Sequence, residues 1–446
     1  MPVCPLEFRY GRRNMVSVFS EENKLQKMLD VESALAKALA AEGIIPKKDA
    51  EEISKAATVK RVTVENVAKI EAEIKHDIMA VVKALSQCAG ESGKFVHMGA
   101  TSNDIIDTAT ALQLKDAITI IRESLINLRD VLYRLAKRYQ ATVMIGRTHG
   151  QGAVPITFGL KTAVFAAEIQ RHIERLDQMK PRLCVGKMSG AVGTGAAFGP
   201  KALKIQEHVM NELGLGTEIA GTQVIGRDRY AEFIMLLANV ASSLEKYATE
   251  IRNLQRSEIR EVAESFDTGK QVGSSTMANK QNPITCENIC GLARIVRSYV
   301  YPALENIPLW HERDLTNSSA ERFIIPHACI LTDDIITKMT NVFQHLRVYP
   351  ENMKTNIERT NGQIMAESVM IALTRKGMSR QEAHEILRKA SIEADTKKMH
   401  LKTVLEKNAT VAKYLNKKEI QDAMNPFKYI GSAKEIIDRV TARNGD

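Results

Sequence analysis

Proline and glycine are both scarce in this chain, with 12 prolines and 25 glycines among 446 residues. Both residues interrupt helices and mark turns, so their scarcity argues against a turn-rich all-β protein and favours long helices. The apolar fraction of 44% is nevertheless sufficient for a large buried core. General disorder is therefore excluded.

Long apolar runs are also missing. No stretch reaches the ~18 consecutive apolar residues that a membrane-spanning helix needs. The first 13 residues contain one glutamate and three arginines with no apolar segment behind them, so no signal peptide is predicted. We therefore expect a cytoplasmic protein with no membrane partner.

Cysteine is sparse, because six residues are scattered along the chain and none belongs to a Cys-x-x-Cys pair. Cys286 and Cys290 share one helical face, but no histidine stands near them to complete a familiar zinc pattern. Buried free thiols in a reducing compartment are the expected state. No metal site is predicted.

A strong excess of one charge is absent as well. The 62 Lys and Arg residues exceed the 53 Asp and Glu residues by only nine, and the signs alternate locally, as in Glu258–Glu261. A nucleic-acid-binding protein usually gathers its positive charge in one stripe, so no nucleic-acid partner is expected. The mixed signs indicate a solvated surface, and a site for a polyanionic small molecule is the sharper alternative.

Heptad-like stepping of apolar residues is the dominant pattern that is present. Between Gly99 and Gly146 there is neither glycine nor proline, and a second such helix is predicted over 230–265. A third helix is predicted over 161–180, ending at Pro181. The repeats of three and four residues indicate helices packed in a bundle. The two seams are Leu114, Ile118, Ile121, Leu125, Leu128, Leu132, Leu135 and Phe233, Leu237, Val240, Leu244, Tyr247, Ile251, Leu254.

Such long helices cannot all be covered in a compact monomer, so we expect an elongated bundle extended by other subunits. Short strands are expected near 143–147 or 185–191, and the glycine-rich stretch 186–199 is interpreted as a loop between helices. Breaks near Gly99–Ser102 and Asn361–Gln363 suggest three domains. Their predicted limits are 1–108, 109–362 and 363–446.

Two polar segments carry residues suited to proton transfer. In the first, glycines flank the segment that holds His149, and histidine transfers protons readily near neutral pH. The second, Gly269–Pro283, is long for a bundle connection and combines hydroxyls, a lysine and an amide. Long loops of this kind often belong to active sites, although a capping histidine and an ordinary linker remain the alternatives.

Two further segments match helix starts. Thr101 with Asp104, and Ser318 with Glu321, fit the capping-box spacing of Ser/Thr followed three residues later by Asp/Glu. A helix N-terminus also attracts anions, so capping and anion binding both remain open interpretations for Thr101–Asp104.

Lys75–Asp77 forms a charged segment in which a surface histidine is expected. The segment around Arg313 contains the single tryptophan, Trp310, for which a core position is expected. Arg313 and Arg322 have the planar guanidinium that suits carboxylate or phosphate. Together the clusters favour proton transfer on a polycarboxylate.

The serine loop resembles the signature loop of the fumarase/aspartase superfamily, Gly-Ser-Ser-x-Met-Pro-x-Lys-x-Asn-Pro. Within that superfamily the chain resembles the adenylosuccinate lyase family, over residues from about 9 to 431. The motifs that carry this resemblance stand in the family's order: Arg9–Tyr10, Phe19–Lys24, Thr101–Ala109, Arg147–Gln151, Thr222–Asp228 and Ser318–Arg322. One departure is visible, because Ala278 stands where the signature has proline, and this predicts a more mobile loop.

The resemblance implies an all-α, three-domain fumarase/aspartase-like subunit with a long central helical bundle. It implies a homotetramer whose active sites combine residues of three subunits, and no metal or organic cofactor. The implied reaction is β-elimination of fumarate from adenylosuccinate to give AMP, and from the ribotide SAICAR to give AICAR, in purine biosynthesis.

The resemblance also implies roles for individual residues. Ser274 would be the catalytic base and His149 the acid, while Lys280 and Asn282 would stabilise the carboxylate that collects negative charge. Substrate contacts are implied for Arg9, Tyr10, Lys75, His76, Asp77, Thr101, Ser102, Gln223, Ser275, Lys280, Gln281, Asn282, Asn288, Ser318, Ser319, Ala320, Glu321 and Arg322.

Two alternatives remain open at this point. A carboxymuconate-type cycloisomerase shares the serine loop but accounts less well for Ser318–Arg322. An inactive helical scaffold would be expected to have lost Ser274, His149 or Lys280, and all three are present.

Overall fold

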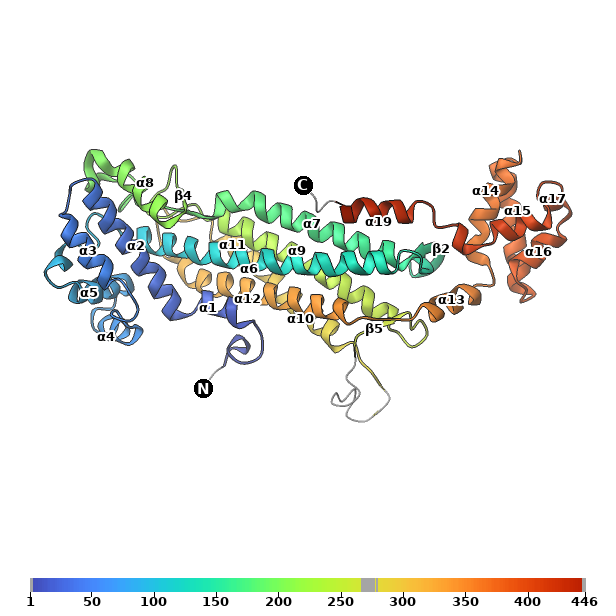
Figure 1. Cartoon of the computed structure of the whole chain (residues 1–446), viewed down its shortest axis with the longest axis horizontal. Helices are drawn as coiled ribbons and strands as arrows, with labels where there is room; N and C mark the ends of the chain where they lie inside the picture. Colours follow the sequence, from blue (N-terminus) through green and yellow to red (C-terminus); the bar gives the residue numbers. More distant parts are fainter. Residues whose placement is uncertain (1–2, 266–276, 278–279, 443–446) are drawn as a thin grey trace. The chain divides into compact units, whose positions relative to one another are not determined.

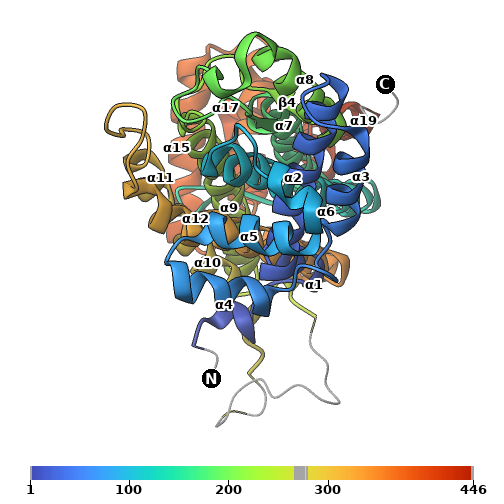
Figure 2. The same ribbon diagram turned by 90° about the vertical axis from the view of Figure 1, so that its left-hand side faces the viewer.

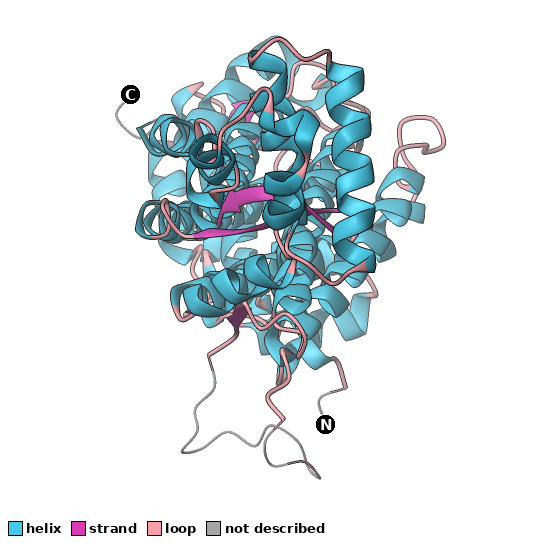
Figure 3. Ribbon diagram, turned by 90° about the vertical axis from the view of Figure 1, so that its right-hand side faces the viewer, coloured by secondary structure: helices cyan, strands magenta, loops and turns pink. Residues whose placement is uncertain are grey.

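The computed structural model describes residues 3–265, 277 and 280–442. The chain forms two compact units, and Figure 3 shows that both are built mainly of helices. The expected all-α fold class is therefore confirmed, whereas the three predicted domain limits stay a prediction. The first unit comprises Met1–Ile126, Arg171–Leu244 and Gly291–Thr337, and the second comprises Asn127–Gln170, Glu245–Cys290 and Lys338–Asp446.

Four long helices contribute segments to both units (Figure 1), and the two predicted seams lie on the first and third of them. Every seam residue is at most 9% exposed, which confirms the helical bundle. In the first unit, Arg122 Nε donates to Asp177 Oδ1 at 2.7 Å, and Ser124 Oγ donates to Asp333 Oδ1 at 2.8 Å. These contacts join α6 to α7 and α6 to α12. The four helices are α6 (Ser102–Arg138), α7 (Phe158–Leu183), α9 (Asp228–Leu254) and α12 (Thr316–Gln344).

The predicted ends of two of these helices are wrong. Helix α9 ends at Leu254 rather than at 265, because the following segment turns, with φ of +50° at Arg260, and then pairs as a strand. Helix α7 continues to Leu183, past the expected stop at Pro181. A proline in the last turn removes one backbone hydrogen bond without preventing the two residues that follow from remaining helical.

The N-terminal helices of the first unit are coloured blue in Figure 2. Ser20 Oγ accepts a hydrogen bond from the Asn23 N–H at 3.2 Å and so caps α2. These helices are α1 (Arg13–Val18), α2 (Glu21–Ala41), α3 (Lys47–Ala56), α4 (Val64–Ile74) and α5 (Asp77–Cys88). The same unit also contains α8 (Ala202–Leu213) and α11 (Val300–Glu305), which come later in the chain.

The C-terminal helices belong to the second unit, and those within residues 350–423 share one apolar core, to which Val143 and Ile145 also contribute. Ile437, on the last helix, packs instead with Ala136 and Ala163. The predicted helix start at Ser379 is confirmed, because its hydroxyl accepts the Glu382 N–H at 3.2 Å. The helices are α13 (Pro350–Arg359), α14 (Ala366–Arg375), α15 (Arg380–Thr396), α16 (Leu401–Lys407), α17 (Ala409–Ala412), α18 (Lys417–Ala423) and α19 (Ala433–Ala442), and α10 (Ile284–Ser298) precedes them in the chain.

Three two-stranded sheets supplement the helices. The expected strands near 143–147 and 185–191 are confirmed, and the glycine-rich stretch 186–199 does connect two helices, α7 and α8. The pairs are antiparallel β1 (Val143–Thr148) with β2 (Gln151–Thr157), parallel β3 (Val185–Gly186) with β4 (Gly216–Thr217), and antiparallel β5 (Val262–Ala263) with β6 (Arg347–Val348). Short 3-10 turns are η1 (Pro5–Glu7), η2 (Gly90–Phe95), η3 (Ala196–Lys201), η4 (Gln363–Met365) and η5 (Pro426–Lys428).

All six cysteines are free, and Cys286 and Cys290 are buried on α10. Trp310, in contrast to the expectation of a core position, is 80% exposed. Within the described ranges, no helix has both the length and the apolar character needed to cross a bilayer.

Candidate active site

His149 occupies the tip of the β1–β2 hairpin in the second unit. Thr148 pairs with Gln151, so His149 and Gly150 are the two central residues of the turn. Their φ angles of +53° and +74° match a type I′ turn, whose twist suits a two-residue hairpin. The histidine is exposed at this tip, held by the backbone as its flanking glycines suggested.

A buried ion pair fixes the strand that leads to His149. The Arg147 guanidinium donates to both carboxylate oxygens of Glu261, at 2.8 and 2.9 Å. Glu261 is completely buried and also accepts from Asn356 Nδ2 at 2.9 Å. The interpretation of 258–261 as solvated surface is therefore wrong for Glu261, because its charge is buried and compensated by these two donors.

The described part of the serine loop also lies in the second unit. Lys280 and Gln281 are exposed, and the Asn288 side chain accepts from Lys338 Nζ at 2.8 Å. Ser274, Ser275 and Ala278 lie outside the described residues, so the base assigned to Ser274 stays a prediction.

In the first unit, the start of α6 anchors the glycine-rich loop. Asp104 accepts the N–H groups of Ser189 and Gly190 at 3.0 Å each, and its carboxylate forms an ion pair with Lys187. Both charged side chains are fully buried. Asp104 also accepts the Thr101 N–H at 2.9 Å, which confirms one half of the predicted capping box. Sequence patterns did not single out Lys187, because no periodic or motif signal marks a buried lysine.

A second buried network lies one turn further along α6. Arg227 donates to both oxygens of Asp107 at 2.9 Å and, through Nε, to Glu321 Oε1 at 3.0 Å. Burial opposes the charged state of Arg227, but the two carboxylates outweigh it and raise its pKa. Burial raises the pKa of Glu321, and this is partly offset by Arg227. Glu321, a predicted substrate contact, is therefore bound to the buried Arg227 side chain.

The predicted capping box at Ser318 and Glu321 is wrong. Helix α12 begins at Thr316, and Asp314 Oδ1 accepts the Thr316 N–H at 2.8 Å. Asp314, rather than Ser318, thus binds a backbone N–H group of the first turn of α12. Ser318, Ser319 and Ala320 lie inside the helix.

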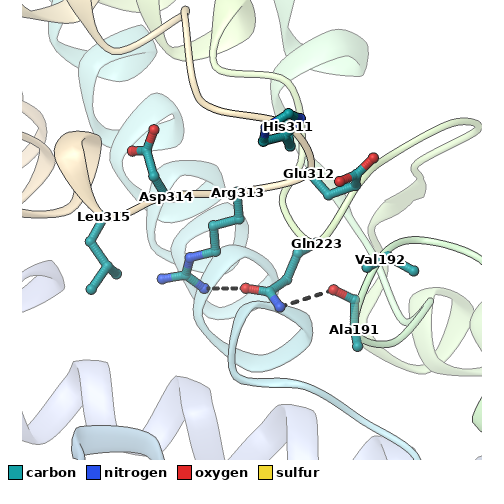
Figure 4. A pocket seen from close by; sticks show the side chains of 8 residues that line it. All are labelled: Ala191, Val192, Gln223, His311, Glu312, Arg313, Asp314 and Leu315. Atoms are coloured by element: carbon teal, nitrogen blue, oxygen red, sulfur yellow. Dashed lines mark hydrogen bonds between the residues drawn. The ribbon is translucent and has the colours of Figure 1, made fainter.

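Gln223 lies in an open pocket of about 370 Å³ in the first unit (Figure 4). Its amide nitrogen donates to the Ala191 carbonyl at 2.9 Å, and its amide oxygen accepts from Arg313 Nη1 at 3.1 Å. Arg313 also donates to Asn103. Partial burial lowers the pKa of Arg313. The same pocket is also lined by the carboxylates of Glu312 and Asp314, so both signs of charge face it. The pocket is lined by Ala191, Val192, Gln223, His311, Glu312, Arg313, Asp314 and Leu315.

The Lys75–Asp77 segment joins α4 to α5 and meets α12. Arg322 Nη2 donates to Asp77 Oδ2 at 3.2 Å. His76 is half exposed, as expected of a surface histidine, and its Nδ1 accepts the Met79 N–H at 3.4 Å as the N-cap of α5. Lys75 ends α4 with φ of +58°. The structure thus brings together three predicted substrate contacts: His76, Asp77 and Arg322.

Arg9 and Tyr10 follow the turn η1, where their N–H groups donate to the Pro5 carbonyl at 2.8 and 3.1 Å. The neighbouring Arg12 donates to Asp333 through two nitrogens, at 2.8 Å each. This ion pair attaches the N-terminal segment to α12. Thr101 and Ser102 are partly buried at the start of α6.

His97 precedes this helix start and was not among the assigned site residues. Its Nδ1 lies 2.6 Å from Glu32 Oε1, and its φ is +64°. Burial, the largest single influence, lowers the pKa of His97, but hydrogen bonding and the charge of Glu32, assisted by Asp104, outweigh it and raise the pKa overall. The sequence does not predict this pair, because His97 and Glu32 are 65 positions apart and belong to no common motif.

Comparisons with known proteins agree with these motifs. The family model described as Lyase matches residues 7–297, and the model described as Adenylosuccinate lyase C-terminus matches residues 362–440. The chain is 53% identical to an adenylosuccinate lyase of Methanothermobacter thermautotrophicus over 99% of this chain and 98% of that protein. It is 54% identical to one of Pyrococcus abyssi over 99% and 97%.

Solved structures show the same fold at lower identity. A fumarate lyase from Mesorhizobium sp. BNC1 aligns with a TM-score of 0.90 and 34% identity, over 99% of this chain and all of that one. A 3-carboxy-cis,cis-muconate lactonizing enzyme from Pseudomonas putida aligns at 0.88 and 31%, over 97% of both chains. With more than half of its residues identical to those of its relatives along almost the whole length, the chain belongs to the adenylosuccinate lyase family.

Proposed function

We propose that this chain catalyses the β-elimination of fumarate from adenylosuccinate, giving AMP, and from SAICAR, giving AICAR. The observation that carries the proposal is the 53–54% identity with adenylosuccinate lyases over 99% of the chain. The match of residues 362–440 to the C-terminal segment of the same family supports it independently.

A cycloisomerase of the carboxymuconate type is the second candidate, because such an enzyme shares the fold. The identity is 31% there, against 53% with the lyase of Methanothermobacter thermautotrophicus. We therefore favour the lyase, and the inactive scaffold is disfavoured because Ser274, His149 and Lys280 are all present.

The chemistry begins with removal of a proton from the carbon beside a carboxylate of the succinyl group. We assign this step to Ser274, whose alkoxide requires a site poor in water and rich in dipoles. The electron pair spreads onto the carboxylate, which Lys280 and Asn282 stabilise. The carbon–nitrogen bond then breaks, and His149 gives a proton to the departing purine nitrogen.

His149 suits the acid role because it stands exposed at the end of a short, rigid turn. The ion pair between Arg147 and Glu261 fixes β1, the strand that leads to His149. The imidazole can therefore approach a bound substrate without rearrangement of the hairpin. A general acid must reach hydrogen-bonding distance of the atom it protonates, and a fixed turn lowers the entropic cost of doing so.

We assign the binding of the polyanionic substrate chiefly to the first unit. His76 and Arg322 are exposed, and Gln223 lines the pocket, so each can present a hydrogen-bond donor or a charge to a substrate. Thr101 and Ser102 lie at the start of α6. A helix N-terminus and arginine side chains are suited to phosphate and carboxylate. Arg9, Tyr10 and Asn288 complete the proposed set.

We further propose a homotetramer in the cytoplasm, with active sites shared between subunits. Large apolar side chains are exposed on α7, α9 and α10, among them Val164, Met235 and Ile295, which are 42–53% exposed. Exposed apolar surface of this kind supports burial against further copies of the chain. Sharing would let the first-unit residues of one subunit meet His149 of another.

An ultraviolet assay of the purified protein tests the activity. Loss of adenylosuccinate with fumarate and AMP appearing in equal amounts is the expected result. The same preparation is offered 3-carboxy-cis,cis-muconate as a control. Formation of a lactone from that substrate, without cleavage of adenylosuccinate, would replace the lyase proposal by the cycloisomerase.

A further inference from the structure

Two side chains of the second unit each bind both Glu264 and Gln281. Gln255 Oε1 accepts the Glu264 N–H at 2.9 Å, and Gln255 Nε2 donates to the Gln281 carbonyl at 3.0 Å. Arg347 Nε donates to the Glu264 carbonyl at 3.0 Å, and Arg347 Nη2 donates to Gln281 Oε1 at 2.7 Å. Four hydrogen bonds therefore connect residues 264 and 281, which are 17 positions apart in sequence.

Glu264 is fixed by its side chain as well. Its carboxylate is buried and accepts the N–H groups of Thr285 and Cys286, at 3.1 and 2.6 Å. These two residues belong to the first turn of α10, whose N–H groups have no partner within the helix. A carboxylate at a helix N-terminus is favoured by both hydrogen bonding and the helix dipole. Glu264 is thus bound to α10 independently of Gln255 and Arg347.

We propose that Gln255 and Arg347 are positioning residues that hold Lys280 and Asn282 in place for the elimination, an inference that rests on the proposed function. Gln281 lies between Lys280 and Asn282 in the sequence. Gln255 and Arg347, which we call the clamp, bind the backbone carbonyl and the side chain of Gln281 respectively. The backbone from which Lys280 and Asn282 project is thereby tied to β5 and α10. Gln281, assigned by resemblance to substrate, serves this clamp.

The stabilisation of a carbanion depends on placement, because a shift of about 1 Å at the reacting groups can cost on the order of 10²-fold in rate. Arg347 lies opposite Ala263 in the β5–β6 pair, so its backbone is set by the strand pairing rather than by the loop. Gln255 follows directly after α9. Arg347 therefore projects from a strand, and Gln255 projects from the residue that follows the end of a long helix.

The test compares Arg347→Ala, Gln255→Ala and Gln281→Ala with the natural chain in the fumarate-release assay. We expect kcat to fall at least about 10-fold in Arg347→Ala, and to fall in each of the other two. Arg388→Ala is the matched control, because Arg388 forms an exposed pair with Glu385 on α15 and contacts none of these residues. Its kcat should be unchanged.

The double variant Arg347→Ala with Gln281→Ala separates positioning from a merely structural role. If Gln281 acts through Arg347, the double variant should have the kcat of Arg347→Ala alone. Multiplicative losses would show that Gln281 acts by itself, for example on substrate, and would overturn the clamp. If Arg347→Ala fails to fold, the same comparison is made with Arg347→Lys, whose single ammonium cannot replace both donors.

The outcome for the natural chain separates this inference from the proposed function. An active natural chain with unchanged kcat in all three single variants would overturn the clamp and leave the lyase function standing. A natural chain with no lyase activity would overturn both, because no elimination would exist for the clamp to serve.

Discussion

Individual buried charges organise the candidate site at the scale of single residues. Asp104, Arg227 and Glu261 are each buried, and each binds at least one segment distant in sequence. Removing one partner of such a pair typically costs ~3–5 kcal/mol, because the remaining charge stays buried without compensation. These residues therefore fix geometry, while His149 and Lys280 stay exposed for chemistry.

His149→Gln and Ser274→Ala should each lower kcat by about 10²–10⁴-fold, the range that acid–base groups typically contribute. Glutamine retains a polar side chain of similar reach but cannot donate a proton as imidazolium does. Affinity for adenylosuccinate, measured by calorimetry on these inactive variants, should survive because the binding residues remain.

Lys280→Ala provides the contrast to these two variants. It should weaken binding as well as turnover, because a desolvated carboxylate would lose its charged partner. Near-normal kcat in Ser274→Ala would require another base, and Ser275 would be the first candidate.

The His97–Glu32 pair should respond to pH. The pKa of His97 is raised in the folded protein, so the pair's stabilisation is fully present below the unfolded value of about 6.5 and is lost as pH rises through the folded value. In Glu32→Gln the imidazole signals of His97, followed by nuclear magnetic resonance, should titrate at lower pH. An identical titration in both proteins would contradict the role of Glu32.

At the scale of helices and strands, the sequence predicted the elements that have a periodic apolar pattern and missed most of the short elements that have none. The seams of α6 and α9 were found because each position returns to the same helix face. The two-residue strands β4, β5 and β6 have no period to detect and were not predicted. The end of α9 was placed 11 residues late because the β5–β6 pairing, a contact with a distant segment, outweighs the local pattern.

The candidate site divides in the same way. Motif resemblance singled out Arg147, Gln223 and Arg322, whose neighbours in sequence are distinctive and whose roles in the site stay predictions. It did not find Lys187 or Glu261, since a buried charge looks like a surface charge until its partner is known. The motifs thus mark single residues, such as Arg147, but not the buried partners that those residues bind, such as Glu261.

Glu261→Gln tests the support of the His149 hairpin. It should destabilise the protein by about 3 kcal/mol, the low end for a broken buried pair, because Arg147 retains 23% exposure and some contact with water. Denaturant unfolding measures the stability, and kcat should fall as well. Arg388→Gln, at an exposed pair, is the control, and equal midpoints for the two variants would contradict the argument.

At the scale of the whole molecule, the proposed assembly is directly measurable. Light scattering at micromolar concentration should give the mass of a tetramer, four times 49.6 kDa. Hybrids of His149→Ala and Ser274→Ala subunits, made by reversible dissociation, should recover part of the activity if the two groups meet from different chains. A monomer would contradict the assembly, and inactive verified hybrids would contradict the sharing.

The positive φ of His149 has one more consequence. A non-glycine residue in the left-handed region costs roughly 1–2 kcal/mol, and asparagine tolerates such turns better than histidine does. Selection for thermal resistance alone would therefore favour Asn-Gly at this tip and would discard the group proposed as the proton donor. Consensus-style stabilisation of this enzyme should leave position 149 untouched, because replacing the strained histidine would remove the proposed proton donor.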